Sequence, residues 1–261
     1  MEFSNVKGIA IYGTDCIVDI SRGDDDVCRF VSAKEKYFNV QQDNNGLLTV
    51  TQKKGNIFYR IIMRRFEFKL ILPRHFVGRL RFRNKNGGLY VDGGGFSDVE
   101  LYTKNGKFEV ANISCADFSL KLRNGSAHLK NVTSAADISV KCDNGDIKAE
   151  NIKASAVTVS CHNAGLSVAD IKARKLDCST NNGTVDANAV DSDAVRLETS
   201  NGKITAVCTG ARDDYRLSLE TTHGAITLDG TPSKTVTDIA SSATRRADLR
   251  TSNGDIDIRF N

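Results

Sequence analysis

The sequence predicts an all-β fold, a right-handed parallel β-solenoid of short rungs of about 19 residues with an irregular β-structured N-terminal cap. An Asn-Gly dipeptide recurs along most of the chain at a nearly constant spacing. Apolar and polar residues alternate on both sides of this dipeptide, which is the pattern of β-strands. The repeat is also too short to hold two strands and a stable helix. The handedness follows the general rule for connections between parallel strands.

The Asn-Gly dipeptides are the predicted corners of the coil. From Asn86 to Asn201 they recur in steps of 19 or 20 residues, and in one repeat Ala164 is inserted before Gly165. Glycine adopts positive φ freely and asparagine does so more readily than most residues, so the pair suits a sharp turn. Stacked asparagine side chains are expected to hydrogen-bond to one another as a ladder. The structural corners predicted in this way are Asn105 and Gly106, Asn124 and Gly125, Asn144 and Gly145, Asn182 and Gly183, Asn201 and Gly202, and Asn253 and Gly254.

Two predicted strands flank each corner. In the rung around Asn182, the apolar residues Leu176 and Cys178 precede the corner and Val185 and Ala187 follow it, with polar residues between them. A period of two places these side chains on one face of each strand, so they are the predicted core. A stack of hairpins would need a second strong turn in each repeat, and only one is visible. The rungs are therefore expected to pair in parallel, about 4.8 Å apart.

The chain is expected to form a single continuous body with two parts. Residues 1–72, where the period fades, are predicted to be irregular strands that cap the stack. Residues 73–261 form the repeat solenoid. The strand after Gly254 is expected to be the other edge, blunted by its charged residues. Self-association through the terminal rungs would use such an edge.

Composition limits the classes of function and the compartment. The chain of 261 residues has a formal net charge of +4, which is too small to indicate nucleic acid as a partner. No signal peptide or membrane span is visible, and the seven cysteines include no C-x-x-C pair. A cytoplasmic protein with reduced cysteines is therefore expected, unless the chain was trimmed. Positions that recur in successive repeats form columns along the stack. Cys142 and Cys161 fall in one inward-facing column, and we interpret them as small hydrophobic core residues.

A basic segment is the strongest local indication of a binding site. Between Arg60 and Lys85 the chain has nine Lys or Arg residues and one acid. Within it, Arg79, Arg81 and Arg83 alternate with apolar residues and share one face of a predicted strand. Such a row is the candidate contact for an anionic partner, since arginine binds phosphates and carboxylates well. The alternative is a solvated face balanced by acids such as those at positions 24–26.

Several repeats resemble a known family. The segments "LRTSNGDIDIRF", "LETSNGKITAV" and "VKCDNGDIKAENI" are similar to the repeated T-x-N-G-D-I-x-V pattern of the bacterial putative-adhesin domain family. The segment "FKLILPRHFVGRLRFRNKNGGLYV" looks like that family's usual entry into its repeats. The resemblance covers essentially the whole chain and implies a parallel β-helical fold. The family is of unknown function and brings no catalytic residues.

The resemblance and the columns together favour a non-enzymatic structural or binding module. Such a module would present its β-solenoid surface to an unknown, anionic macromolecule or would assemble with itself. We assign no catalytic, cofactor-binding or metal-binding residues, because the outward columns mix charges and hydroxyl groups without a cluster of carboxylates. A carbohydrate-active β-helix enzyme is the alternative, and it would need two carboxylates in one outward pocket. A sensor or scaffold component of an envelope-stress system is the third reading.

Overall fold

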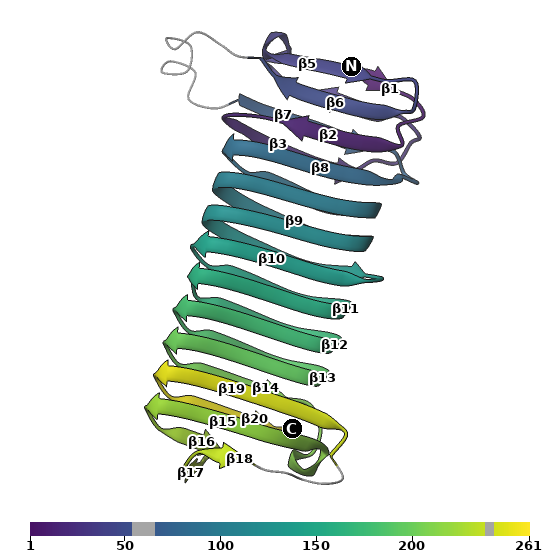
Figure 1. Cartoon of the computed structure of the whole chain (residues 1–261). Helices are drawn as coiled ribbons and strands as arrows, with labels where there is room; N and C mark the ends of the chain where they lie inside the picture. The colour runs from purple at the N-terminus through teal and green to yellow at the C-terminus, as the bar shows by residue number, and fades with distance from the viewer. Residues whose placement is uncertain (54–65, 238–242) are drawn as a thin grey trace. The chain divides into compact units, whose positions relative to one another are not determined.

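The computed structural model describes residues 1–53, 66–237 and 243–261, and most of them belong to β-strands (Figure 1). They form two compact units, residues 1–128 and residues 129–261. The strands pair mostly in parallel, and the prediction of an all-β solenoid is confirmed. The predicted partition into a cap and a repeat region differs from this division and stays a prediction. Within the described residues, no helix is long and apolar enough to cross a membrane.

The first unit begins with short strands and ends in continuous rungs. Its elements are β1 (Glu2–Phe3), β2 (Gly8–Tyr12), β3 (Cys16–Arg22), β4 (Cys28–Val31), the 3-10 turn η1 (Glu35–Tyr37), β5 (Phe38–Gln42), β6 (Leu47–Gln52), β7 (Phe66–Leu72), β8 (Val77–Asn86) and most of β9 (Leu89–Ser134).

In this unit the first rung of the sequence lies inside the stack. Strand β2 pairs in parallel with β6 on one side and with β8 on the other, so Gly8 lies opposite both Leu47 and Arg79 (Figure 1). Strand β3 lies between β7 and β9 in the same way. The outer strands are antiparallel: β5 covers β6, β4 covers β7, and β1 covers β4. The irregular cap thus consists of β1, β4 and β5, whereas β2 and β3 form a regular rung.

The second unit contains the most regular repeats. Its elements are the end of β9, β10 (Asp137–Asn144), β11 (Ile147–Asn163), β12 (Leu166–Asn182), β13 (Val185–Asn201), β14 (Ile204–Cys208), the 3-10 turn η2 (Arg212–Asp214), β15 (Tyr215–His223), β16 (Ile226–Leu228), β17 (Thr231–Ser233), β18 (Val236–Thr237), β19 (Arg245–Asn253) and β20 (Ile256–Phe260).

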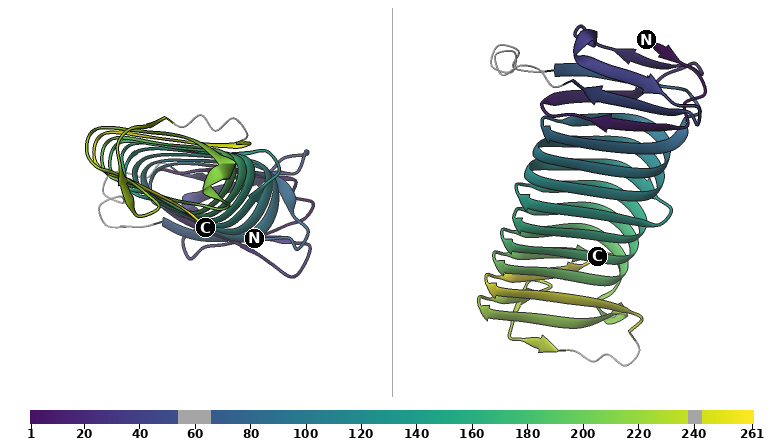
Figure 2. Two further views of the ribbon diagram at one scale, coloured as in Figure 1. Left: turned by 90° about the horizontal axis from the view of Figure 1, so that it is seen from below. Right: turned by 45° about the horizontal axis from the view of Figure 1, so that its top comes forward.

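Strands β11 to β13 stack in register, one repeat above the next, and successive turns follow similar paths (Figure 2). Leu176, for example, lies opposite Val157 and Val195. The predicted inward positions Leu176, Cys178, Val185 and Ala187 are all at most 1% exposed. Burial of one such leucine stabilises the fold by about 1.5–3 kcal/mol, so the inward columns account for the cohesion of the stack.

The predicted asparagine ladder is present. In the second unit the Nδ2 of Asn182 donates to Oδ1 of Asn163 at 2.7 Å, and Asn201 donates to Asn182 at 2.8 Å. In the first unit Asn105 and Asn124 continue the same arrangement from Asn86. The threonine of the repeated motif has a role as well, because the buried hydroxyl of Thr199 donates to the carbonyl of Gly183 at 3.0 Å.

Glycine follows most of the corner asparagines, for two different reasons. Gly183 has φ of +145°, and a Cβ placed on it would collide with the carbonyl oxygen of Ala164 on the rung before. Gly106 has no positive φ, but its Cβ would collide with the carbonyl oxygen of Gly87. Close approach of rungs, and not backbone conformation alone, therefore selects glycine at the corner. Ala164 takes this glycine position without an insertion, because Asn163 stays opposite Asn182.

A second corner, which the sequence analysis missed, lies seven residues after five of the corner asparagines. Non-glycine residues there adopt the left-handed conformation, with φ between 51° and 57°, and they are Asn112, Asn131, Asn151, Asp170 and Ala189. Asparagine and aspartate tolerate this conformation better than other side chains. The side chains form a second ladder, in which Asn151 donates to Asn131 at 2.8 Å. These rungs therefore turn at two fixed corners.

The expectation that the final strand is an open edge is wrong. Strand β19 lies between β13 and β15, and β20 lies between β14 and β16 (Figure 1). The amide of Gly202 donates to Asn253, and the amide of Gly254 donates to His223, each at 3.0 Å. The last rung of the sequence is thus internal, and the rung of β15 and β16 lies outside it. Antiparallel β18 and β17 cover that outer rung.

The cysteines are buried core residues. All seven are free, and Cys142 lies directly opposite Cys161, as predicted. Hydrogen bonding to Cys142 and then burial raise the pKa of the Cys161 thiol. Burial raises the pKa of Cys178 to about 12. The neighbouring His162 is exposed, on the opposite face of its strand. Hydrogen bonding to Cys161 lowers the pKa of the Cys142 thiol. Because all seven side chains are buried, however, these thiols lack the access that reactive cysteines require.

Candidate functional site

The arginine row (Arg79, Arg81 and Arg83) lies on the outward face of β8, and acids of the next rung neutralise it in part. Arg79 is 2.9 Å from Asp98, whereas Arg81 and Arg83 contact the two oxygens of Glu100 at 2.8 and 2.7 Å. These partners differ from the acids at positions 24–26 that the sequence suggested. The arginines at positions 60, 64 and 65 lie outside the described residues.

Glu100 is the centre of this network. The hydrogen bond from Arg83, together with the charges of Arg81 and Arg83, holds the pKa of Glu100 below its usual range against the effect of burial. The charge of Glu100 and a hydrogen bond to the Tyr12 hydroxyl raise the pKa of Arg81. Reversing the arginine row to glutamate would place three new carboxylates beside Asp98 and Glu100. A test of binding therefore needs neutral substitutions.

Two exposed tyrosines flank Arg83 on neighbouring rungs. Tyr12 of β2 lies opposite Arg83, and Arg83 lies opposite Tyr102 of β9. Lys121 follows Tyr102 by one further repeat. The outward column therefore alternates ring, cation, ring, cation, and we call these four residues the tyrosine column. Both tyrosines are 37% exposed, so part of each ring is open to a ligand.

A hollow of about 660 Å³ lies over the tyrosine column. Its lining, the tyrosine hollow, comprises Tyr12, Gly13, Arg83, Asn84, Lys85, Glu100, Leu101, Tyr102, Lys104, Ser119 and Lys121. Four of these side chains are cationic and one is a carboxylate. In the described part of the chain, Lys85, Lys104 and Lys121 take part in no ion pair, whereas Arg83 shares Glu100. The lining is therefore net positive as well as aromatic.

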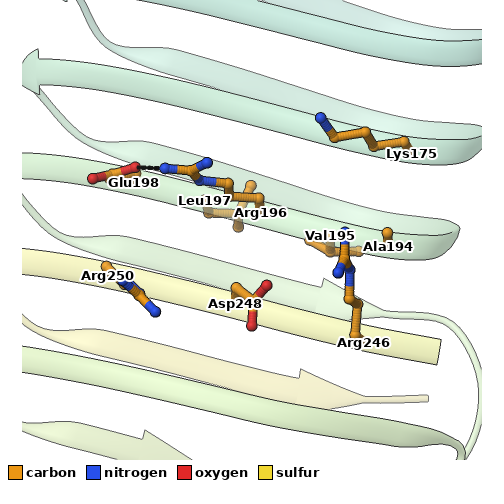
Figure 3. Close-up of a pocket in the computed structure, with 9 residues that line it drawn as sticks. All are labelled: Lys175, Ala194, Val195, Arg196, Leu197, Glu198, Arg246, Asp248 and Arg250. Atoms are coloured by element: carbon orange, nitrogen blue, oxygen red, sulfur yellow. Dashed lines mark hydrogen bonds and ion pairs between the residues drawn. The ribbon is translucent and has the colours of Figure 1, made fainter.

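A second hollow, of about 300 Å³, lies on β12, β13 and β19 of the second unit (Figure 3). It exists because the short side chain of Ala194 lies between Lys175 and Arg246 on the neighbouring strands. Figure 3 shows Arg246 reaching from β19 across to Val195.

Its charges are balanced by neighbouring acids. Arg196 contacts Glu198 at 2.6 Å, and Lys175 contacts Asp177 at 3.0 Å. Asp248, which also lines the hollow, lies beside Arg246 on β19. The lining includes no aromatic side chain. The second hollow therefore offers less to a ligand than the tyrosine hollow does, although the inserted β19 completes it.

The arrangement favours binding over chemistry. Among the described residues, no group of three His, Cys, Asp or Glu side chains is placed to hold a metal ion. The tyrosine hollow has Glu100 as its carboxylate, and Arg81 and Arg83 already engage it. The second hollow has Glu198 and Asp248, of which Glu198 is engaged by Arg196. A glycosidase needs one of its two carboxyl groups free to donate a proton.

Sequence reasoning found part of this surface. It assigned the arginine row, which the structure places beside the tyrosines, but it gave no role to Tyr12 or Tyr102. The alternation of Tyr102 and Lys121 in one outward column was a usable signal. Tyr12 could not be added to that column, because the position of β2 between β6 and β8 is invisible in the sequence.

Comparisons with known proteins find a matching family. Residues 6–259 match the family described as Toastrack DUF4097. No curated protein matches the sequence. Among solved structures, the chain is similar to a protein described as a putative cell adhesion protein from Clostridium sporogenes ATCC 15579. The two share 13% identity, with a TM-score of 0.27, over 99% of this chain and 94% of the other.

Proposed function

Because the chain belongs to the Toastrack DUF4097 family, a family of unknown function, we propose from its own surface that it is a non-enzymatic binding module of adhesin type. The module presents an outward side of its β-solenoid to a macromolecule. It does not assemble by adding its terminal rungs to those of another copy.

The covered end of each unit carries this proposal. In the first unit β5 and β4 pair antiparallel with the outermost parallel strands, and in the second unit β17 and β18 do the same. A bare terminal rung would be a template for another chain, whereas short antiparallel strands blunt it. The sides of the rungs are then the surfaces left for a partner. The tyrosine hollow is such a surface.

Sedimentation velocity tests this proposal. Under reducing conditions, the protein is expected to sediment as a monomer over a wide concentration range, at both low and high salt. The physical reason is that short antiparallel strands pair with part of each outermost parallel edge and so blunt it as a template for another chain. Species that grow with concentration and persist at high salt would show assembly through the ends and would contradict the proposal.

The enzyme alternative receives less support from the surface. It needs a pair of carboxylates beside a bound sugar, and aromatic rings on which the sugar packs. The rings lie in the tyrosine hollow of the first unit, whereas the pair of carboxylates lies in the second hollow, on the second unit. Neither hollow combines the two features, so we propose binding alone.

A further inference from the structure

We propose that the tyrosine hollow binds a linear acidic polysaccharide in which carboxylated and neutral sugars alternate. This deepens the proposed function and rests on it, because it names the ligand that the side of the solenoid takes. The polymer would run across the rungs, along the tyrosine column, and the proposal is carried by the order, exposure and charge of that column.

The order of the side chains matches an alternating ligand. Along the stack the column presents Tyr12, Arg83, Tyr102 and Lys121, one from each successive rung. Rungs are about 4.8 Å apart, so like groups recur about every 10 Å. The flat apolar body of a tyrosine packs against the apolar face of a sugar, and its hydroxyl bonds at the rim. A cation between two rings then meets an acidic group between two stacked sugars.

The charge of the hollow is available to a ligand. Lys85 and Lys104 form a second row beside the column, because Asn84 and Asn86 pair with Thr103 and Asn105 on the next rung. Lys85 and Lys121 are exposed and Lys104 is half-buried. With Arg83, these residues make four cations against the single carboxylate of Glu100. The excess of positive charge requires an anionic ligand.

Two arginines of the row are held in place before any ligand arrives. Arg81 is fixed by Glu100 at 2.8 Å. Glu100 holds Arg83 through its other oxygen at 2.7 Å. A ligand that meets this surface therefore orders few side chains, which lowers the entropic cost of binding. Arg81 is a positioning residue in this scheme, and Arg83 is a contact residue.

Charge density favours a polysaccharide over a nucleic acid. Sequence-independent binding of nucleic acid commonly uses about 6–10 phosphate contacts. The hollow supplies three unpaired lysines and one partly neutralised arginine, on a chain of net charge +4. A polymer with an acidic group on every second unit needs fewer cations. A folded acidic protein would match the charge, but its surface lacks the repeat that the column shows.

Isothermal titration with a hyaluronan octasaccharide, in which carboxylated and neutral sugars alternate, tests the proposal on the full chain. Binding is expected, and a neutral chitin oligosaccharide of equal length is expected to bind at least about 10-fold more weakly. Tyr102→Ala should weaken binding about 10-fold, whereas Tyr102→Phe should retain most of it, because the ring supplies the contact. Both variants should melt as the wild type does, since the side chain is exposed.

Two matched double variants distinguish binding at the tyrosine hollow from nonspecific attraction to the positive charge of the protein. Lys104→Gln with Lys121→Gln should weaken binding about 10-fold and reduce its salt dependence. Lys153→Gln with Lys172→Gln removes the same charge from exposed positions of the second unit and should leave binding unchanged.

Three outcomes would overturn the ligand assignment. The first is that no octasaccharide binds, the second is that the neutral one binds equally well, and the third is that an oligodeoxythymidine binds more tightly than either. If oligodeoxythymidine binding were lost in the Tyr102→Ala variant, the proposed function would stand with a different ligand. Assembly through the ends, seen by sedimentation, would instead overturn the proposed function itself.

Discussion

Deleting residues 245–261 is expected to release the rung of β15 and β16 as well as the deleted strands. In the second unit β15 reaches the stack through β19, and β16 reaches it through β20. Without them, β13 and β14 lose their outer partners, and the inward residues Leu217 and Leu219 lose a neighbouring column. Since each repeat is stabilised chiefly by its neighbours, an internal rung should matter more than a terminal one.

Limited proteolysis followed by mass spectrometry measures this effect. Cleavage within residues 215–228 should be slow in the full chain and rapid in the truncated chain, while residues 147–190 stay resistant in both. A truncated protein that still protects residues 215–228 would mean that β15 and β16 dock directly on β13 and β14. That result would contradict the prediction that the rung of β15 and β16 depends on β19 and β20.

Replacing Gly183 with alanine is expected to lower the free energy of unfolding of the second unit by at least about 3 kcal/mol. Two costs add at this corner. The residue has φ of +145°, which an L side chain rarely adopts, and the new Cβ would collide with the carbonyl oxygen of Ala164. That oxygen belongs to the backbone of the preceding rung and cannot move without breaking the stack. Urea unfolding followed by circular dichroism measures the change.

Gly230→Ala is the matched control for the corner substitution. Gly230 also has positive φ, +77°, but a Cβ on it would meet nothing within 4 Å. Its replacement should cost about 1 kcal/mol, the conformational penalty alone. If the two variants lost equal stability, close approach between rungs would not be the reason for glycine at the corner.

The inward columns and the first corner were predictable because the same residue pattern recurs in successive repeats. The residues around Asn182 alternate so strictly that one period-two pattern identifies strand, face and core together. The second corner also left a signal, in the asparagines at positions 112, 131 and 151. It was overlooked because no glycine follows them and because Ala189 fills the same position. A left-handed residue flanked by apolar positions is harder to recognise than an Asn-Gly pair.

The position of the last rung inside the stack was not predictable, because the repeat is so regular. Leu249 fits opposite Leu197 and Leu219 equally well, because all three occupy the same column. Thr251 and Asn253 likewise match either neighbour in the threonine and asparagine ladders. Because such a rung can pair in register with any other rung, the sequence of its column residues alone does not determine its position in the stack.

The tyrosine hollow was partly hidden for the same reason. Arg83 and Tyr102 belong to neighbouring repeats and could be aligned by their spacing. Tyr12 belongs to a rung outside the regular series, and its place depends on the insertion of β2 between β6 and β8. The surface therefore needed the structure to bring its two rings onto either side of one cation.

Native-state hydrogen exchange across the second unit tests the central claim, that the last rung of the sequence lies inside the stack. Amides of an internal strand are paired on both sides of the rung and open only with the unit, whereas outer strands open locally. Residues 246–253 are expected to exchange as slowly as residues 194–201 and more slowly than residues 215–223. Fast exchange of residues 246–253, with slow exchange of residues 215–223, would show that the rungs stack in sequence order and would contradict it.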